Sequence, residues 1–214
     1  MALKEVKNDQ IFASVLADGK IHVTVPEGTE GAVVREYETS TGEKGSKTEK
    51  IYTQLVGKIT KVNFYEGDYG RQLQLTVDDG KEKPVVLSLS TSSSYGEDMM
   101  KKLLSIDITR TVKIVPYSFE DDNKKKKKGI TIWQKADGAE KPNKVGNYFY
   151  DEETKATLHG FPEPKKGKKP LSKDQWKLYF GEVREFLVEK ITEHFKLEEV
   201  AKTPSMNDDD FDNF

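Results

Sequence analysis

The sequence contains no cysteine among its 214 residues. This absence excludes disulfide bonds, zinc–thiolate sites and thiol nucleophiles. No apolar run approaches the roughly 20 residues that a membrane-spanning helix needs. The opening residues Met-Ala-Leu-Lys-Glu-Val-Lys also lack the apolar core of a signal peptide. Together these absences predict a soluble protein of a reducing compartment, the cytoplasm.

The residues and motifs that usually carry catalysis are also scarce. The three histidines, His22, His159 and His194, lie far apart and show no metal-ligand spacing. The chain has neither a phosphate-binding glycine loop nor a nucleophile elbow. Acid pairs such as Asp78-Asp79 fall in predicted turns, where carboxylates are normally solvated. We therefore expect no enzymatic activity, no metal and no cofactor, and an enzyme built from residues distant in sequence stays open as an alternative.

The charge is nearly balanced overall but unevenly distributed. The formal net charge is -2, from 35 basic and 37 acidic residues. Residues 203–214 hold four acids and no base, so residues 1–202 carry +2. Five consecutive lysines, Lys124 to Lys128, and a second lysine cluster at 165–169 stand out within that body. The pattern predicts a mildly basic domain, 1–202, followed by a flexible acidic segment, 203–214.

The apolar alternation predicts a mainly β protein. A hairpin is expected over 11–25 around Asp18-Gly19, and residues 38–50 are expected to form a loop or linker. Residues 51–135 follow the order strand, strand, strand, short helix, strand, strand. The apolar phase of the first strand slips near Thr60-Lys61, which predicts a bulge, and Gly57 predicts a bend. This order resembles the OB-fold, a five-stranded Greek-key barrel, here with an N-terminal hairpin and a C-terminal helix.

The C-terminal helix is predicted over 172–200. Ser172 and Gln175 have the spacing of a capping box. An apolar stripe follows at helical spacing, and it favours packing against the barrel, with a self-association face as the alternative. The stripe comprises Trp176, Tyr179, Phe180, Val183, Phe186, Leu187 and Ile191.

Basic and aromatic residues concentrate where an OB-fold binds a nucleic-acid strand. Such a site needs cations for the phosphates and aromatic faces for the bases. In this fold the site uses strands two and three and the loops that join strands one to two and four to five. For the aromatic residues, filling of the core is the alternative. The candidate residues are Lys58, Lys61, Tyr65, Tyr69, Arg71, Gln72, Gln74, Tyr117, Phe119, Lys124, Lys125, Lys126, Lys127, Lys128, Trp133 and Lys135.

The acidic segment, 203–214, indicates a more specific function. With its acids and its aromatic end, it resembles the tails of single-stranded-DNA-binding proteins of bacteria and of T7-like phages. The resemblance implies a barrel that coats single-stranded DNA and a tail that recruits replication, recombination and repair enzymes such as a polymerase, helicase, primase or nuclease. It assigns partner binding to Asp208, Asp209, Asp210, Phe211, Asp212 and Phe214.

Four features depart from the bacterial proteins. Asn213 replaces the usual proline, which leaves the identity of the partner open. The lysine insertion at 124–128, the N-terminal hairpin and the C-terminal aromatic helix are not bacterial features, and they favour a phage-encoded protein of the host cytoplasm. We expect a monomer or dimer that acts without a membrane. An RNA-binding OB protein and an assembly adaptor that binds no nucleic acid are the alternatives.

Overall fold

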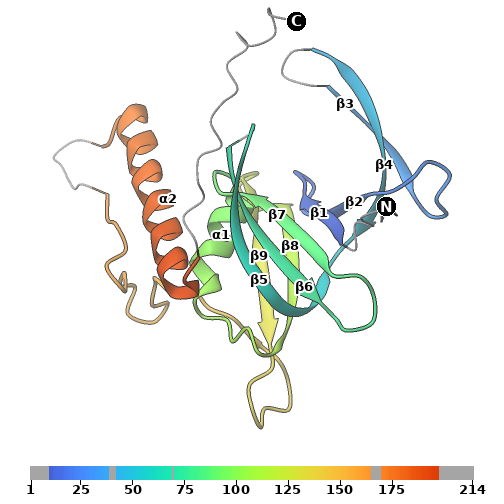
Figure 1. The fold of residues 1–214 in the computed structure, drawn as a ribbon. Helices are drawn as coiled ribbons and strands as arrows, with labels where there is room; N and C mark the ends of the chain where they lie inside the picture. Colours follow the sequence, from blue (N-terminus) through green and yellow to red (C-terminus); the bar gives the residue numbers. More distant parts are fainter. Residues whose placement is uncertain (1–9, 39–41, 69, 165–169, 198–214) are drawn as a thin grey trace, which may run out of the picture.

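The computed structural model describes residues 10–38, 42–68, 70–164 and 170–197, and these form one open ten-stranded mixed sheet with two α-helices. The strands pair in the order β10-β9-β8-β5-β6-β7-β1-β2-β4-β3 (Figure 1). The elements are β1 (Ile11–Val15), β2 (Ile21–Thr24), β3 (Val33–Glu38), β4 (Lys44–Tyr52), β5 (Leu55–Gly67), β6 (Gly70–Asp78), β7 (Val85–Ser90), α1 (Ser94–Leu103), β8 (Thr111–Glu120), β9 (Lys126–Gln134), β10 (Asn143–Lys144) and α2 (Lys173–Phe195).

The five central strands are organised around β5. Its first residues pair with β8 and its remainder pairs with β6, so β5 belongs to both halves of the sheet. The register shifts between Ile59 and Lys61, which confirms the predicted bulge. At Gly57 a Cβ atom would lie 2.7 Å from the carbonyl oxygen of Asp78. Only glycine allows this close approach where β5 changes partner.

The closed five-stranded barrel is not confirmed, because the sheet is open. Closure would require the outer edges of β7 and β9 to pair with each other. The edge of β7 instead pairs with β1 in parallel. The edge of β9 meets α1: the Ile130 amide donates to Asp98 Oδ2 at 2.6 Å, and Lys102 Nζ donates to the Ile130 carbonyl at 2.6 Å. Side chains of α1 thus occupy backbone groups that a neighbouring strand would otherwise bond.

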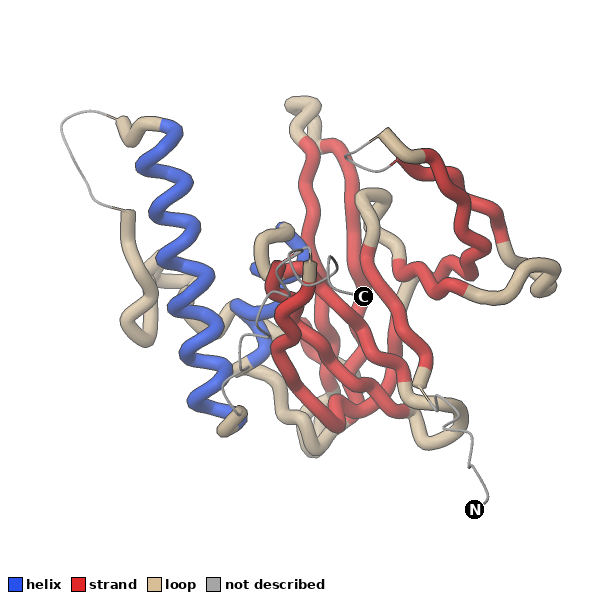
Figure 2. The backbone as a smooth tube through the Cα atoms, turned by 45° about the horizontal axis from the view of Figure 1, so that its top comes forward, coloured by secondary structure: helices blue, strands red, loops and turns tan. Residues whose placement is uncertain are grey.

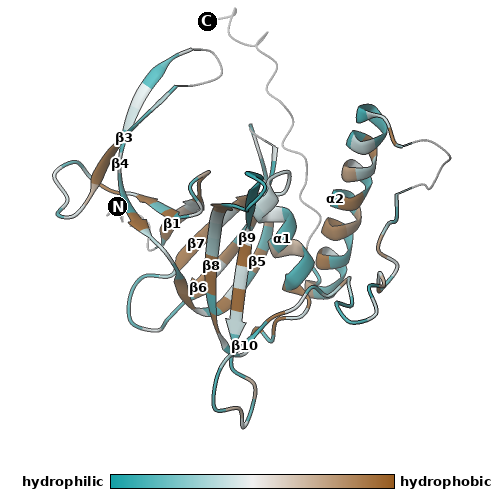
Figure 3. Ribbon diagram, turned by 180° about the vertical axis from the view of Figure 1, so that it is seen from behind, coloured by the Kyte–Doolittle hydropathy of each residue, from teal (hydrophilic) through white to brown (hydrophobic). Residues whose placement is uncertain are grey.

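The hydrophobic core lies between the inner side of the sheet and the two helices. Leu73, Leu75, Ile114 and Ile132 alternate with exposed or half-buried residues along their strands and are fully buried. Helix α1 adds Met99, Met100 and Leu103, and α2 adds Val183, Leu187 and Ile191. Figure 3 shows apolar residues following β7, β8 and β9 and one side of α2. The capping box of α2 is present as predicted.

Only part of the predicted stripe on α2 packs against this core. Val183, Leu187 and Ile191 are buried, whereas Trp176 and Phe180 remain 39% and 45% exposed. The Trp176 and Phe180 rings stack on each other at 5.6 Å, one helical turn apart. The stripe therefore anchors the second half of α2 and leaves an aromatic pair on its first half.

Residues 38–50 do not form the predicted linker. Residues 44–50 belong to β4, which pairs with both β3 and β2. Together β3 and β4 form a two-stranded ribbon, called the arm below, that extends from the sheet on the side away from α2 (Figures 1 and 2). The β1–β2 hairpin, by contrast, forms as predicted, with Gly19 at a positive φ of 75°.

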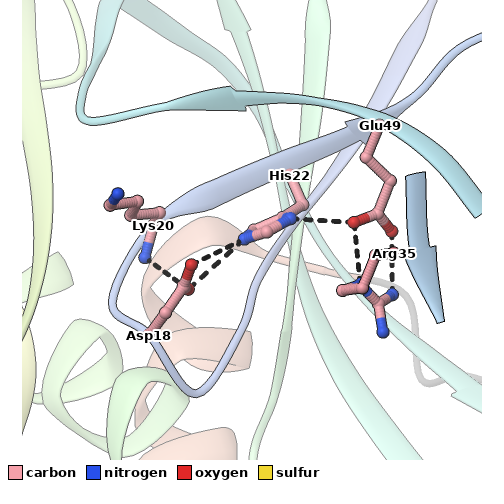
Figure 4. A network of polar contacts seen from close by, with 5 residues as sticks. All are labelled: Asp18, Lys20, His22, Arg35 and Glu49. Carbon is pink, nitrogen blue, oxygen red and sulfur yellow. Dashed lines mark hydrogen bonds and ion pairs between the residues drawn. The ribbon is translucent and has the colours of Figure 1, made fainter. Parts of the chain in front are cut away.

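A buried polar network joins the arm to β2 (Figure 4). Arg35 on β3 donates two hydrogen bonds of 2.8 Å to the carboxylate of Glu49 on β4. His22 lies between two carboxylates, with Nδ1 2.9 Å from Glu49 and Nε2 3.1 Å from Asp18. Hydrogen bonds from Arg35 and then from His22 lower the pKa of Glu49 to about 2. Glu49 is therefore a buried carboxylate with charged and polar partners on two strands.

Replacement of Asp98 by alanine should destabilise the fold. The variant leaves the Ile130 amide without its acceptor, so we expect the free energy of unfolding to fall by about 1–3 kcal/mol in urea denaturation. Glu97→Ala, which removes a part-exposed ion pair with Lys101 on the same helix, is the matched control and should cost less than about 1 kcal/mol. Equal losses in the two variants would contradict the role given to Asp98.

Acid should weaken the attachment of the arm through Glu49. Its pKa is depressed from 4.5, so its contribution is present above pH 4.5 and is lost as the pH falls toward 2. In Glu49→Gln the unfolding free energy at pH 7 should fall by up to about 3 kcal/mol, and its decline between pH 5 and 2.5 should flatten. Denaturation at stepped pH measures this, with the exposed Glu36→Gln as control. A decline as steep as in the wild type would contradict the assignment.

Candidate nucleic-acid interface

One side of the sheet gathers several of the predicted binding residues. The inward side chains of β5, β6 and β7 fill the core, so the alternate residues point outward. Cross-strand pairing sets them in rows, for example Asn63–Gln74–Ser88, and β1 continues the rows because Ser14 pairs with Ser88. We call this the outer face; it comprises Phe12, Ser14, Lys61, Asn63, Tyr65, Gln72, Gln74, Thr76, Val86, Ser88 and Ser90.

The outer face combines exposed rings with uncharged polar groups. Tyr65 is 53% exposed and Phe12 is 52% exposed. Gln72 and Gln74 are half-buried between them, and the Gln74 amide donates to the Ser88 hydroxyl at 3.3 Å. Lys61 supplies a cation, and a carboxylate in the same alternation, Asp78 at the end of β6, pairs with Lys58. Flat rings beside amides and hydroxyls can stack on bases and hydrogen-bond to them.

Phe12 is not among the residues predicted from the sequence. The one signal for it is its position next to Ala13, which is buried, so that Phe12 lies on the exposed side of the strand. Its position beside Val86 depends on the parallel pairing of β1 with β7. No local pattern predicts that pairing, because parallel partners can be any distance apart in the sequence.

A second group of predicted residues lies on the β8–β9 hairpin. Phe119 pairs with Lys127, and Lys113 pairs with Trp133, so each end of one side of the hairpin has a ring opposite a lysine. Phe119 is 55% exposed, and its ring centroid lies 5.7 Å from that of Tyr117. Burial raises the pKa of the Tyr117 hydroxyl. Lys58 lies on β5, the strand that joins this group to the outer face.

The run of lysines from 124 to 128 was predicted to form a loop, but part of it belongs to a strand. Lys126, Lys127 and Lys128 begin β9, and only Lys124 and Lys125 lie in the turn. Asp121 orders the turn by accepting hydrogen bonds from the amides of Asn123 and Lys125 at 3.0 and 2.9 Å. The lysines therefore stand at fixed positions along a hairpin. Lys135 follows the end of β9 and is exposed.

Arg71 lies apart from the other candidates. It points to the side opposite Gln72, because neighbouring residues of a strand face opposite ways. Its guanidinium donates to Glu66 at 3.1 Å and to Glu185 on α2 at 3.0 Å. Burial lowers its pKa, but the hydrogen bonds that it donates to the two carboxylates outweigh that effect and leave the pKa raised. Arg71 therefore connects the β5–β6 hairpin with α2, which makes it a structural cation.

Several predicted residues fall outside the described ranges. They are Tyr69, the lysine cluster at 165–169, and the partner-binding set Asp208, Asp209, Asp210, Phe211, Asp212 and Phe214. Within the described part of the chain, no group of three or more His, Cys, Asp or Glu side chains could hold a metal ion. No helix in that part is long and apolar enough to cross a membrane.

Comparison of the chain with family models, with curated proteins and with solved structures finds no match in any of the three.

Proposed function

We propose that the protein is a sequence-tolerant single-stranded-DNA-binding protein that coats and protects DNA during phage replication, recombination and repair in the host cytoplasm. The observation that carries the proposal is the outer face, where two exposed rings flank amide and hydroxyl side chains on a rigid sheet. Base stacking on such rings contributes about 1–3 kcal/mol per base whatever the sequence, because every base has a π-face.

The strand order supports the same function. The strand order β9-β8-β5-β6-β7, with α1 between β7 and β8 in the chain, matches the connectivity of an OB-fold. We propose that the fold is an opened OB-type barrel. Its strands two and three, β6 and β7, then carry the middle of the outer face, and the lysine turn at 121–125 becomes the loop between strands four and five.

Cations of the β8–β9 hairpin complete the site. A single strand of DNA that leaves the outer face meets Lys58 on β5 and then the two ring–lysine pairs of the hairpin. The rings on the outer face require unstacked bases, which a duplex does not offer. We therefore propose binding to single strands in preference to duplexes.

The acidic segment supplies the partner-binding function. We propose that Phe211, Phe214 and the aspartates between 208 and 212 recruit replication and repair enzymes. The same negative segment competes with DNA for the lysines, since both are polyanionic.

Titration of a fluorescent oligo-dT should reveal salt-sensitive binding. Anisotropy measured at several salt concentrations should give a log-log slope of about -0.7 per neutralised phosphate. Tyr65→Ala and Phe12→Ala should each weaken binding about 5- to 150-fold, because each removes a ring that stacks on a base. Competition with matched duplex and RNA oligonucleotides completes the measurement.

The matched control is Trp176→Ala, an exposed ring on α2 away from the outer face. It should leave the affinity unchanged. The proposal would be overturned if the wild-type protein preferred duplex DNA to single strands. Preference for RNA over DNA would instead identify an RNA-binding protein.

Removal of residues 206–214 should tighten DNA binding at low salt. The deletion removes all four aspartates of the segment, and the gain should disappear above about 0.3 M salt because the competition is electrostatic. Anisotropy with the same oligo-dT measures it. A variant with Phe211 and Phe214 changed to alanine keeps the charge, so it should keep the competition; a gain equal to that of the deletion would argue against a charge-based mechanism.

A further inference from the structure

The arm continues the outer face without a change of side. The row Gln74–Ser88–Ser14 extends to His22 on β2 and then to Ile51 on β4, because paired residues share a side of the sheet. Alternate residues of β4 and their partners on β3 therefore belong to that same side. On the arm these are Val33, Arg35, Tyr37, Gly45, Lys47 and Glu49.

The two sides of the arm differ in charge. The side continuous with the outer face carries Arg35 and Lys47, and its one carboxylate, Glu49, is buried and already bonded to Arg35 and His22. The opposite side carries Glu36 and Glu38 together with Lys44 and Lys50, so its charges balance. The first side keeps one net positive charge, which attracts a polyanion.

The groups on the basic side are held in defined positions. The Tyr37 ring lies across Gly45, where a Cβ atom would come within 2.6 Å of the ring. Lys47 Nζ and Arg35 Cζ lie 5.5 and 5.8 Å from the centre of that ring. Arg35 is fixed by two bonds to Glu49, and Lys47 is exposed. An aromatic ring with two cations beside it can bind single-stranded DNA, because the ring stacks on a base and the cations attract phosphates.

We propose that the arm is a second segment of the binding site, on which Lys47 and Tyr37 contact the same single-stranded DNA that lies on the outer face. The inference depends on the proposed function. The step from β6 to β4 crosses four strand spacings, roughly 19 Å at about 4.8 Å each. That span is about six nucleotides at a stacked spacing of about 3.4 Å. Long oligonucleotides reach both segments and very short ones do not.

The test compares Lys47→Gln with Lys44→Gln on dT15 and dT5. Lys44 lies on the same strand but on the opposite side of the arm, so it is the matched control. Lys47→Gln should weaken dT15 binding about fivefold at 0.1 M salt and reduce the salt slope by about 0.7, which is the loss of one phosphate contact. It should leave dT5 binding unchanged. Lys44→Gln should change neither oligonucleotide.

A second variant, Tyr37→Leu, tests the ring while keeping an apolar side chain over Gly45. It should weaken dT15 binding and leave the salt slope unchanged, because stacking neutralises no phosphate. Thermal melting of each variant checks that the arm remains folded. Equal effects of Lys47→Gln and Lys44→Gln, or no effect of Lys47→Gln on dT15, would overturn the role of the arm. Absence of dT15 binding by the wild type would instead overturn the proposed function.

Discussion

The architecture depends on how two strand edges satisfy their backbone hydrogen bonds. The edge of β9 is bonded at Ile130 by Asp98 and Lys102, so no strand can pair with it at that residue. The free edge of β7 pairs instead with β1, in parallel. On the β9 side the sheet ends in the two-residue strand β10, whereas on the β7 side it continues through β1, β2, β4 and β3. The hairpin and the arm are therefore extensions of the β7 edge.

The added strands β1, β2 and β4 also determine which residues continue the outer face. Each added strand keeps the in-and-out alternation of its neighbour, so the outward rows run from β5 to β4. The rows begin with Lys61 and Tyr65 and lead to the basic side of the arm. The proposed DNA site, if it follows these rows, is longer than an ordinary OB-type site, which ends at strand three. The network of His22, Arg35 and Glu49 fixes the far end of these rows.

Local patterns predicted much of the fold and less of the site. The bulge near Thr60 and the Ser172 capping box are encoded by neighbouring residues, and both are present. The arm was missed because glycine, lysine and glutamate have low β-propensity, and β4 is held by Arg35 and His22, which are distant in sequence. The contact of Arg71 with Glu185 could not be predicted, because the two residues are 114 positions apart in the sequence. Phe12 required knowledge of a long-range parallel pair.

The parallel pair of β1 and β7 also sets an order for folding. Ile11 pairs with Val85, 74 positions later, so a long loop must close before β1 can dock. Such non-local pairing is slow compared with the formation of the adjacent β5–β6 and β8–β9 hairpins. Until β1 arrives, the edge of β7 has unpaired backbone groups and is open to strands of other chains. Docking of β1 therefore also protects this edge from pairing with other chains.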